Sequence, residues 1–534
     1  MSRTKPKRRP TRAVARVAAL VGGAVLVTSV ALAQKATPGY NHEIPAPIMT
    51  PDRVETSIGT LEFHDGLPSA ETAKKVFDNL DRARGMQVFL NAIPAASLQA
   101  MVVGNRAMGV QAANDVLIMD DLMDSAPLFL TGNTDTVYVS AVFDLQRDGP
   151  TVVEVPAGSG PGTVNDAFFR FVTDMGSVGP DRGRGGTYVI LPPDYEGELN
   201  PPEGGMEAEM DVGGAKRKVF VSKSRSYVNW MILRGFLVDG KPDAASKMYR
   251  EGLKVYPLSA AANPPPMRFI SGSGKFFNTI HANDYHFYLE LDQVIQREPV
   301  AFIDPELRGL IASIGMVKGK AFSPDARMKK ILTDAVAIGN ATARSLVFDT
   351  PIPAAYKWKG SQWKTAFIGG DYQWLMDGGR GGRFLDARSY FFYVATVNTP
   401  AMAMKFVGKG SQYAFANRDE DGRYLYGEKN YKLHVPPNVP AKDFWSVVIY
   451  DPQTRSELQT GQPFPSKNDE KAGLVENPDG SVDLYFGPKP PAGKEGNWIQ
   501  TVPGKGWFAL LRLYGPLDPW FDDEWRPGEF ELLK

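Results

Sequence analysis

Residues 137–143 read VYVSAVF and residues 227–237 read YVNWMILRGFL, and these two stretches decide the fold class. Both are rich in β-branched and aromatic side chains, which favour strands. Clusters of glycine and proline separate them, and short strands with regular turns are typical of an antiparallel sandwich. We therefore predict a first β-sandwich over residues 126–262. Its expected strands are Val137–Phe143, Thr151–Val155, Ala167–Thr173, Thr187–Leu191, Val219–Ser222 and Tyr227–Leu237.

The C-terminal third of the chain has the same character. Runs of aromatic and β-branched residues alternate there with loops rich in Gly, Pro, Asn and Asp. This pattern predicts a second β-sandwich, most simply a jelly roll, over residues 376–534. Its expected strands are Tyr390–Val397, Tyr431–Val435, Phe444–Tyr450, Ser481–Phe486 and Trp507–Tyr514.

Helical spacing appears in residues 69–125, which we expect to form N-terminal helices. It appears again in residues 263–375, which we expect to form a helical segment that connects the two sandwiches. In the first stretch, Pro94 is expected to divide the chain into two helices. In the second, Asp304-Pro305-Glu306 places a capping side chain, a first-turn proline and an acid at a helix start. Strands and helices do not alternate one for one, which disfavours a parallel α/β sheet. The predicted class is α+β, mainly β: two antiparallel β-sandwich or jelly-roll domains joined by a helical linker.

The N-terminus has the pattern of an export signal. Residues 1–16 carry seven basic side chains and no acidic one, and Val17–Ala33 is an uncharged run of 17 residues that ends in Ala-Leu-Ala. A basic start, a short apolar core and an A-x-A end are typical of a cleavable signal peptide. An uncleaved membrane anchor is the alternative, although 17 residues are barely enough to span a bilayer. We expect residues 1–33 to be removed, residues 34–68 to form an extended leader, and the protein to be periplasmic or secreted.

Composition excludes several classes of site. The chain has no Cys, so disulfides, iron–sulfur clusters and a Cys nucleophile are ruled out, and it has only five His. Loss of residues 1–33 would change the formal net charge from 0 to −7, which does not suggest a nucleic-acid partner. No phosphate-binding GxxxxGK[ST] and no G-x-S-x-G elbow occurs. The sequence thus indicates no cofactor and no metal, and it predicts membrane contact only through an uncleaved signal segment.

Several ordered motifs carry a family resemblance. Asn133–Tyr138, Asp148-Gly149-Pro150 and the stretch GPDRGRGGTYVILPP at residues 179–193 resemble the bacterial domain-of-unknown-function family 1254. Later motifs resemble its usual companion, family 1214, and the two together cover roughly residues 70–534. This resemblance implies two β-sandwich domains joined by a helical segment and a protein of the cell envelope, but it implies no reaction. The later motifs are Asp421-Gly422, Tyr431–Pro437, Phe444–Asp451, Asn477–Ser481, Asn497-Trp498 and Leu513–Pro516.

The first candidate site is the motif Asn133–Tyr138 at a strand entrance. Asp135 there is a candidate general base or ligand, with Asn133, Thr136 and Tyr138 as ligand-binding candidates. Asp174 ends another expected strand, and two carboxylates about 5–10 Å apart would suit glycosidic chemistry. The structural alternative is a turn in which Asn and Asp side chains bond to nearby backbone.

Arginine and tryptophan residues supply the other candidates. Arg182 and Arg184 lie in a Gly-rich loop, where they could bind a carboxylate or phosphate or simply be solvated. Arg234 and Arg512 interrupt otherwise apolar strands, and a buried charge needs a partner, which is either an internal ion pair or an anionic ligand. Trp498 is a candidate aromatic platform for a ligand, with packing as the alternative.

These features predict an exported cell-envelope protein that binds a small or glycan ligand in a cleft between two β-sandwiches. One alternative is an envelope hydrolase or lyase that acts on a glycan or small anionic compound through Asp and Arg groups. A second alternative is a metal-dependent jelly-roll enzyme, which would have to combine His with carboxylates. Convergence of Asp135, Asp174, Arg182 and Arg234 on one cavity would favour an enzyme.

Overall fold

A computed structural model describes residues 44–470 and 473–534. The expected signal segment, residues 1–33, lies outside the described residues. The chain divides into two compact units, Met1–Ala73 and Lys74–Lys534. With 28% of residues in strands and 27% in helices, arranged as separate sheets and helical segments, the fold is α+β as predicted.

The first unit contains a small antiparallel sheet. Its strands are β1 (Arg53–Thr56), β2 (Gly59–His64) and β3 (Leu67–Pro68), in that order. Asp65 and Gly66 both have positive φ between β2 and β3, which suits a tight hairpin turn. Part of the expected extended leader, residues 53–68, is therefore a three-stranded meander preceded by the short helix η1 (Ala46–Ile48).

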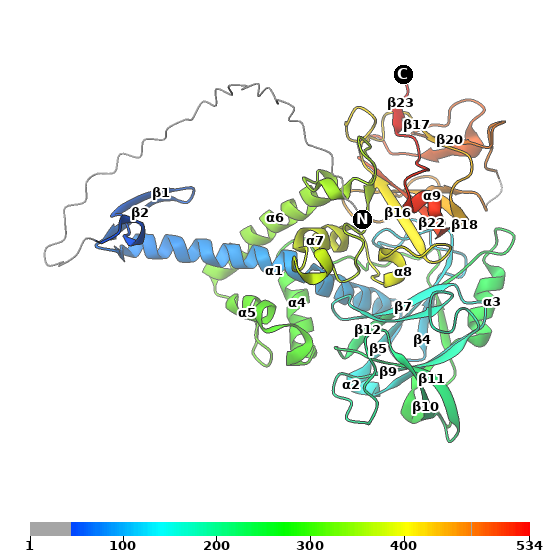
Figure 1. The fold of residues 1–534 in the computed structure, drawn as a ribbon, viewed down its shortest axis with the longest axis horizontal. Coiled ribbons are helices and arrows are strands. Elements are labelled where there is room, and N and C mark those ends of the chain that lie inside the picture. Colours follow the sequence, from blue (N-terminus) through cyan, green and yellow to red (C-terminus); the bar gives the residue numbers. More distant parts are fainter. Residues whose placement is uncertain (1–43, 471–472) are drawn as a thin grey trace, which may run out of the picture. The chain divides into compact units, whose positions relative to one another are not determined.

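The first sandwich of the second unit packs a six-stranded sheet on a five-stranded one (Figure 1). Val139, Met231 and Tyr188 belong to the apolar layer between these two sheets. The six-stranded sheet has the order β14 (Arg268–Ser271), β4 (Asp115–Ile118), β5 (Val137–Asp144), β12 (Val228–Gly235), β7 (Pro161–Asp166), β8 (Phe171–Gly176). The five-stranded sheet has the order β10 (Met206–Asp211), β11 (Lys216–Lys223), β9 (Gly186–Leu191), β6 (Thr151–Val155), β13 (Lys254–Pro257).

The second sandwich packs a five-stranded sheet on a four-stranded one. Trp445, Leu511 and Leu484 belong to the layer between them. The five-stranded sheet has the order β15 (Lys364–Thr365), β16 (Ser411–Ala416), β22 (Phe508–Pro516), β18 (Ala441–Tyr450), β19 (Ser466–Asn468). The four-stranded sheet has the order β21 (Trp498–Gln500), β20 (Val482–Gly487), β17 (Tyr431–Val435), β23 (Phe530–Leu532).

Strand pairing is antiparallel throughout most of both sandwiches. Among the described strands, the parallel pairs are β9 with β11, β4 with β14, and β20 with β21. The predicted strand Ala167–Thr173 is wrong at its start, because Asp166 Oδ1 accepts hydrogen bonds from the backbone N–H groups of Phe168 and Arg170 and holds a turn there.

Helix α1 (Ala70–Ala107) is continuous, so the prediction that Pro94 divides it is wrong. A proline lacks the N–H group that would bond to the carbonyl four residues earlier, which here is the carbonyl of Leu90. The Ser389 hydroxyl, on helix α7 (Leu385–Val394), donates to that carbonyl at 2.9 Å. Tertiary contact thus replaces the missing bond, which local sequence cannot reveal.

The predicted strand Tyr390–Val397 is also wrong, because helix α7 occupies most of it. Every residue from Ala387 to Val394 is buried. A helix that is buried on all sides has no polar face, so its aromatic run cannot be told from a strand by periodicity. The remaining helices are α2 (Leu145–Asp148), α3 (Asp243–Gly252), α4 (His286–Arg297), α5 (Pro305–Ser313), α6 (Ala326–Phe348), α8 (Pro400–Ala403) and α9 (Asp518–Phe521).

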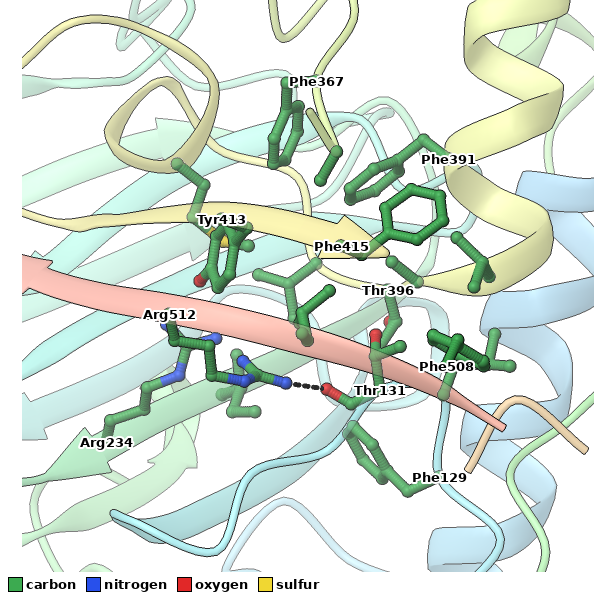
Figure 2. A pocket seen from close by; sticks show the side chains of 18 of the residues that line it. Phe129, Thr131, Arg234, Phe367, Phe391, Thr396, Tyr413, Phe415, Phe508 and Arg512 are labelled. Carbon is green, nitrogen blue, oxygen red and sulfur yellow. Dashed lines mark hydrogen bonds between the residues drawn. The ribbon is translucent and has the colours of Figure 1, made fainter. Parts of the chain in front are cut away.

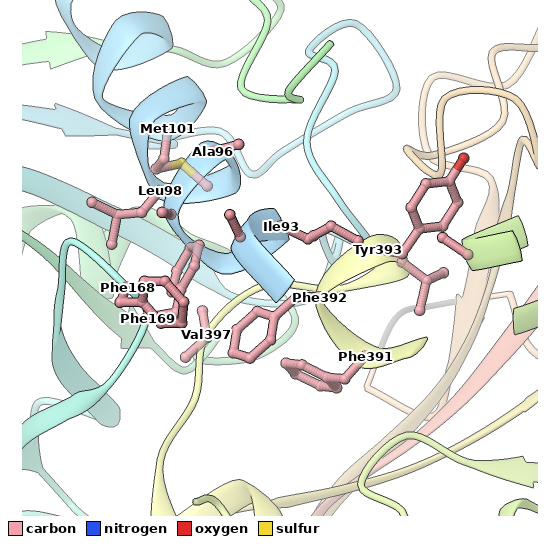
Figure 3. Packing of buried hydrophobic residues seen from close by; sticks show 14 of the residues in the cluster. Ile93, Ala96, Leu98, Met101, Phe168, Phe169, Phe391, Phe392, Tyr393 and Val397 are labelled. Carbon is pink, nitrogen blue, oxygen red and sulfur yellow. The ribbon is translucent and has the colours of Figure 1, made fainter. Parts of the chain in front are cut away.

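A third apolar core joins the sandwiches to the helices. Figure 3 shows Ile93 and Ala96 of α1 close to Phe169, Phe392 and the neighbouring aromatic side chains. This core also takes in the outer face of β12 and the outer face of β22, so both strands are buried along their whole length. The two sheets that contain these strands therefore face each other across the middle of the second unit.

Helix α1 is long and apolar enough to cross a membrane, and among the described residues it is the one helix that meets this test. Of the 18-residue stretch of α1 that is most apolar, 78% is buried inside the protein. Phe89 packs on Phe287 of α4, and Gly85 lies against Leu332 of α6. These contacts are those of a core helix.

Candidate functional site

A cavity of about 40 Å³ lies between the two facing sheets. Strands β5 and β12 of the first sandwich form one wall, and β16 and β22 of the second form the other. The segment Phe129–Thr131 and the end of α7 with residues 395–397 complete the lining. Figure 2 shows Arg234 and Arg512 reaching the same space from opposite strands. We call this space the central cavity.

Strand register places polar side chains in matching rows on the two walls. Arg234 of β12 pairs with Tyr138 of β5. Arg512 of β22 lies between Tyr413 of β16 and Ser446 of β18. Side chains at paired positions point to the same face of a sheet, so each wall presents one arginine beside one tyrosine.

Arg512 is held by neutral oxygens. Its Nη2 donates to the carbonyl oxygens of Thr131 and Gly132, the latter at 2.9 Å, and to the hydroxyl of Tyr450 at 2.8 Å. The guanidinium carbon also lies 5.4 Å from the centre of the Tyr413 ring. These contacts fix the guanidinium but bring no negative charge to it.

Arg234 has still fewer partners. Its guanidinium carbon lies 5.6 Å from the centre of the Tyr138 ring, and its buried Nε has no hydrogen-bond partner. Burial lowers the pKa of Arg234, but the phenol oxygens of Tyr138 and Tyr413 outweigh this and raise it above its ordinary value, while the charge of Arg512 works against it. The group is therefore cationic at neutral pH.

The sequence left open an internal ion pair for these two arginines, and the described residues, 44–470 and 473–534, provide none. Tyrosine phenols act on both guanidinium groups, and the charge of Arg512 also acts on Arg234. Arg234 is 6% exposed and Arg512 is 3% exposed. Two like charges thus share a closed space without a protein carboxylate between them.

Other buried polar atoms around the arginines also lack hydrogen-bond partners. They belong to side chains of β12, β16, β18 and β22 and of the segment after α7. Buried polar groups in folded proteins nearly always have a partner, so a cluster of such atoms at one place calls for an explanation. The atoms are Arg234 Nε, Arg512 Nε, Thr396 Oγ1, Ser411 Oγ, Tyr413 Oη, Ser446 Oγ and Tyr514 Oη.

The rest of the central cavity is apolar. Phe367 and Phe391 lie 4.3 Å apart between ring centres, and Phe415 and Phe508 stand on the facing sheet. The central cavity therefore has a cationic end and an aromatic body. Chemically, this arrangement suits an anion with a small apolar part, because a guanidinium fork binds a carboxylate through two parallel hydrogen bonds.

The motif at residues 133–136 forms a buried hydrogen-bonded turn next to the central cavity. Asn133 Oδ1 accepts from the backbone N–H groups of Asp135 and Thr136. Asn133 Nδ2 donates to the hydroxyl of Tyr138 at 2.6 Å. Asp135 Oδ1 accepts from Asn468 Nδ2 of β19 at 2.7 Å, so this carboxylate ties the two sandwiches together. Tyr138, two residues after this turn, lines the central cavity, and Asn133 holds its hydroxyl in place.

Asp174 lies deep in β8 and faces a different neighbour from Asp135. Its Oδ1 accepts from the hydroxyl of Thr399 at 2.7 Å. Burial raises the pKa of Asp174 to about 7, while hydrogen bonds from Thr399 and Thr163 oppose the rise. Thr163, Thr399 and Arg234 line a small cavity of about 10 Å³ beside the central one. Thr399 thus links Asp174 to the small cavity that Arg234 also lines. A catalytic role for Asp174 stays a prediction.

The remaining sequence candidates lie elsewhere. Arg182 and Arg184 are exposed on the turn after β8, where Arg184 Nε donates to the carbonyl of Asp181 at 3.3 Å. Trp498 lies on β21 in the four-stranded sheet, and its Nε1 donates to the carbonyl of Gly487 at 2.9 Å. None of the three lines the central cavity. Their ligand-binding roles stay predictions.

The sequence missed most of the cavity lining. Arg512 stands out as a charge in an apolar strand, but Thr131, Thr396 and Tyr413 carry no signal of their own. Tyr413 meets Arg512 because β16 and β22 pair across about 100 residues of chain. For a metal, the described residues hold no group of three or more His, Asp or Glu side chains that could bind one.

Comparisons with known proteins divide the chain in the same way as the sheets. Residues 113–257 match the model of a family described as protein of unknown function (DUF1254), and residues 410–518 match that of protein of unknown function (DUF1214). Tyr138 and Arg234 lie in the first segment, and Tyr413 and Arg512 lie in the second. The central cavity is thus built between the two segments.

Two solved structures resemble this chain. The VPA0106 protein from Vibrio parahaemolyticus is 16% identical, with a TM-score of 0.50 over 85% of this chain and 100% of its own, which indicates a shared fold. An uncharacterized protein from Burkholderia cenocepacia is 12% identical, with a TM-score of 0.37 over 86% of this chain and 96% of its own. No curated protein matches significantly. Two segments of the chain therefore match the DUF1254 model and then the DUF1214 model, in the order that its motifs predict.

Proposed function

We propose that this protein binds a small carboxylate in the central cavity, with its charged end between Arg234 and Arg512. One observation carries the proposal: two buried guanidinium groups share this space, and among the described residues no carboxylate pairs with either of them. An unpaired buried charge is costly, and an anion of the right size would offset that cost.

The size and lining of the central cavity narrow the ligand class. About 40 Å³ is room for roughly three waters, and hence for an anion of about four or five non-hydrogen atoms. Phe129, Phe415 and Phe508 would contact the apolar part of such an anion. The hydroxyl groups of Tyr413 and Thr396 could donate to its oxygens. Acetate and propionate have this chemistry.

We further propose that this binding takes place outside the cytoplasm. The support is the basic start, the apolar run Val17–Ala33 and the Ala-Leu-Ala end of the N-terminal segment. Cell fractionation with mass spectrometry of the purified protein tests this part. We expect a mature N-terminus at Gln34 in the periplasmic or secreted fraction, and a full-length protein in the cytoplasm would contradict it.

Titration calorimetry with acetate and propionate tests the ligand. We expect saturable binding with one site per chain in the wild type and at least a tenfold loss of affinity in Arg512→Met, since a hydrogen bond to a charged group contributes about 1.5–3 kcal/mol. Arg418→Met is the matched control, because Arg418 pairs with Asp349 on another surface. Absence of binding in a folded wild type, or equal loss in the control, would contradict the proposal.

A hydrolase or lyase is the second candidate function, and Asp174 is the observation that favours it. A carboxyl group with a pKa raised to about 7 by burial can act as a general acid or base at neutral pH. The Asp174→Asn variant should then abolish turnover of a small carboxylate ester without changing acetate binding. If wild type and variant turn over such substrates equally slowly, the binding function stands alone.

A further inference from the structure

A second and larger cleft, of about 870 Å³, opens on the side of the first sandwich. Its walls are the turn Asp166–Val172, the segments 193–203 and 299–307, and the segment 372–374 with α7. The volume is that of ordinary small-molecule sites. We call this space the outer cleft.

Arg388 of α7 is the buried cation of the outer cleft. The residue is only 8% exposed, its Nη2 donates to Asn91 Oδ1 at 2.9 Å, and its Nε has no hydrogen-bond partner. Burial, together with the nearby charge of Arg383, lowers the pKa of Arg388 to about 10. At neutral pH the group is still charged, and its guanidinium carbon lies 5.8 Å from the centre of the Phe168 ring.

Arg383 is the second cation, and it stands at the exposed rim. It donates to the carbonyl of Gln373, a neutral acceptor. Among the described residues, neither Arg383 nor Arg388 forms an ion pair with a carboxylate. Asp304 acts electrostatically on both, and its Oδ1 already caps α5 by accepting from the N–H group of Leu307 at 2.8 Å; Asp371 also acts on Arg383.

The other two arginines of the outer cleft have carboxylate partners. Arg170 pairs with Asp166 at 2.6 Å, and Arg225 pairs with Glu203 at 3.6 Å. Glu203 also accepts from the hydroxyl of Tyr372 at 2.7 Å. Lys223 of the lining donates to the carbonyl of Tyr195 at 3.1 Å, and Asp194 accepts from the hydroxyl of Tyr227 at 3.0 Å. Of the four arginines that line the outer cleft, Arg383 and Arg388 are thus the two without a carboxylate partner among the described residues.

The outer cleft also has aromatic walls. Phe168, Tyr372, Trp374 and Phe392 all line it. Trp374 and Phe392 pack at a ring distance of 6.0 Å and, with Phe391 and Phe367, form an aromatic wall on the side where the central cavity lies. Flat apolar surfaces beside a guanidinium pair suit a planar ring that bears a carboxylate.

We propose that the outer cleft is a separate binding site for an aromatic carboxylate, with the carboxylate on Arg383 and Arg388 and the ring between the aromatic walls. This site goes beyond the binding of a small carboxylate in the central cavity. The aromatic ligand is too large for about 40 Å³, so the two sites take different members of one chemical class.

Titration calorimetry of the full protein with 1-naphthoate tests the outer cleft. We expect one site per chain and a loss of affinity of about tenfold or more in Arg383→Ala and in Arg388→Met. Arg380→Ala is the matched control, because Arg380 is an exposed arginine of the same loop that does not line the outer cleft. Arg383 is exposed, so its variant keeps the test decisive if Arg388→Met fails to fold.

Three further arms separate the alternatives. Saturating acetate should leave naphthoate binding unchanged, so that failure of either site is seen independently of the other. Binding of galacturonate or inorganic phosphate in place of naphthoate would overturn the aromatic class. Naphthoate binding that Arg380→Ala weakens as much as Arg383→Ala would overturn the assignment to the outer cleft.

Discussion

Replacing Arg234 with methionine should make the unliganded protein more stable. Methionine has a similar length and no charge, and Arg234 has no carboxylate partner among the described residues. Replacing buried charged groups with apolar side chains of similar volume is neutral or stabilising by about 1–4 kcal/mol. We therefore expect the free energy of unfolding of Arg234→Met to exceed that of the wild type by about 1–4 kcal/mol in buffer without small carboxylates.

The ligand should reverse this order. An anion at 100 times its dissociation constant stabilises the wild type by about 2.7 kcal/mol, because it binds only the native state. The variant lacks one of the two guanidinium groups, so it should gain little. Adding acetate should therefore close or invert the stability gap between the two proteins.

Urea unfolding followed by tryptophan fluorescence, with and without acetate at matched ionic strength, measures both effects. Arg297→Met is the control, because Arg297 pairs with Asp144 at 2.6 Å and its loss should destabilise the protein equally in both buffers. The reasoning is refuted if Arg234→Met is less stable than the wild type without acetate and is stabilised by acetate to the same extent.

Three other changes test particular parts of the account. Ser389→Ala removes the donor to the Leu90 carbonyl that Pro94 leaves without its helical partner, and it should lower the free energy of unfolding by about 1 kcal/mol, measured in urea. Asp174 is protonated in the native state up to pH about 7, whereas in the unfolded chain it is ionised above its ordinary pKa of 3.8. It should therefore make the free energy of unfolding fall as pH rises from about 4 to 7. Asp174→Asn should flatten that fall, which the midpoints of urea unfolding would show. Leu510→Ala should cost about 2–5 kcal/mol in the same assay and let the central cavity accept longer carboxylates, which calorimetry with butyrate would reveal.

The sequence predicts the two sandwiches because their strands alternate in a way that local reading can detect. β17 (Tyr431–Val435) has the predicted bounds, and β18 and β22 contain the aromatic runs expected to be strands. The errors lie at the start of the predicted strand Ala167–Thr173, at α7 and at Pro94. At the last two, packing against distant segments overrides local preference. From local sequence alone, a helix buried on every side resembles a strand. A proline whose lost bond is replaced by Ser389 resembles a break between two helices.

The candidate site was predictable only in part. Arg234 and Arg512 stand out because a charge inside an apolar strand needs an explanation. Their meeting depends on which faces of two sheets oppose each other, and that depends on pairings such as Arg512 with Tyr413 that no local pattern encodes. Arg182 and Trp498 have suggestive neighbours in the sequence, yet the fold places them away from the central cavity.

A crystal structure of the protein with bromoacetate tests the central claim most directly, because bromine can be located by its anomalous scattering. The account predicts a bromine peak in the central cavity, with the carboxylate between the guanidinium groups of Arg234 and Arg512. A carboxylate of the protein itself lying between these two groups, with no bromine peak in the cavity, would contradict it.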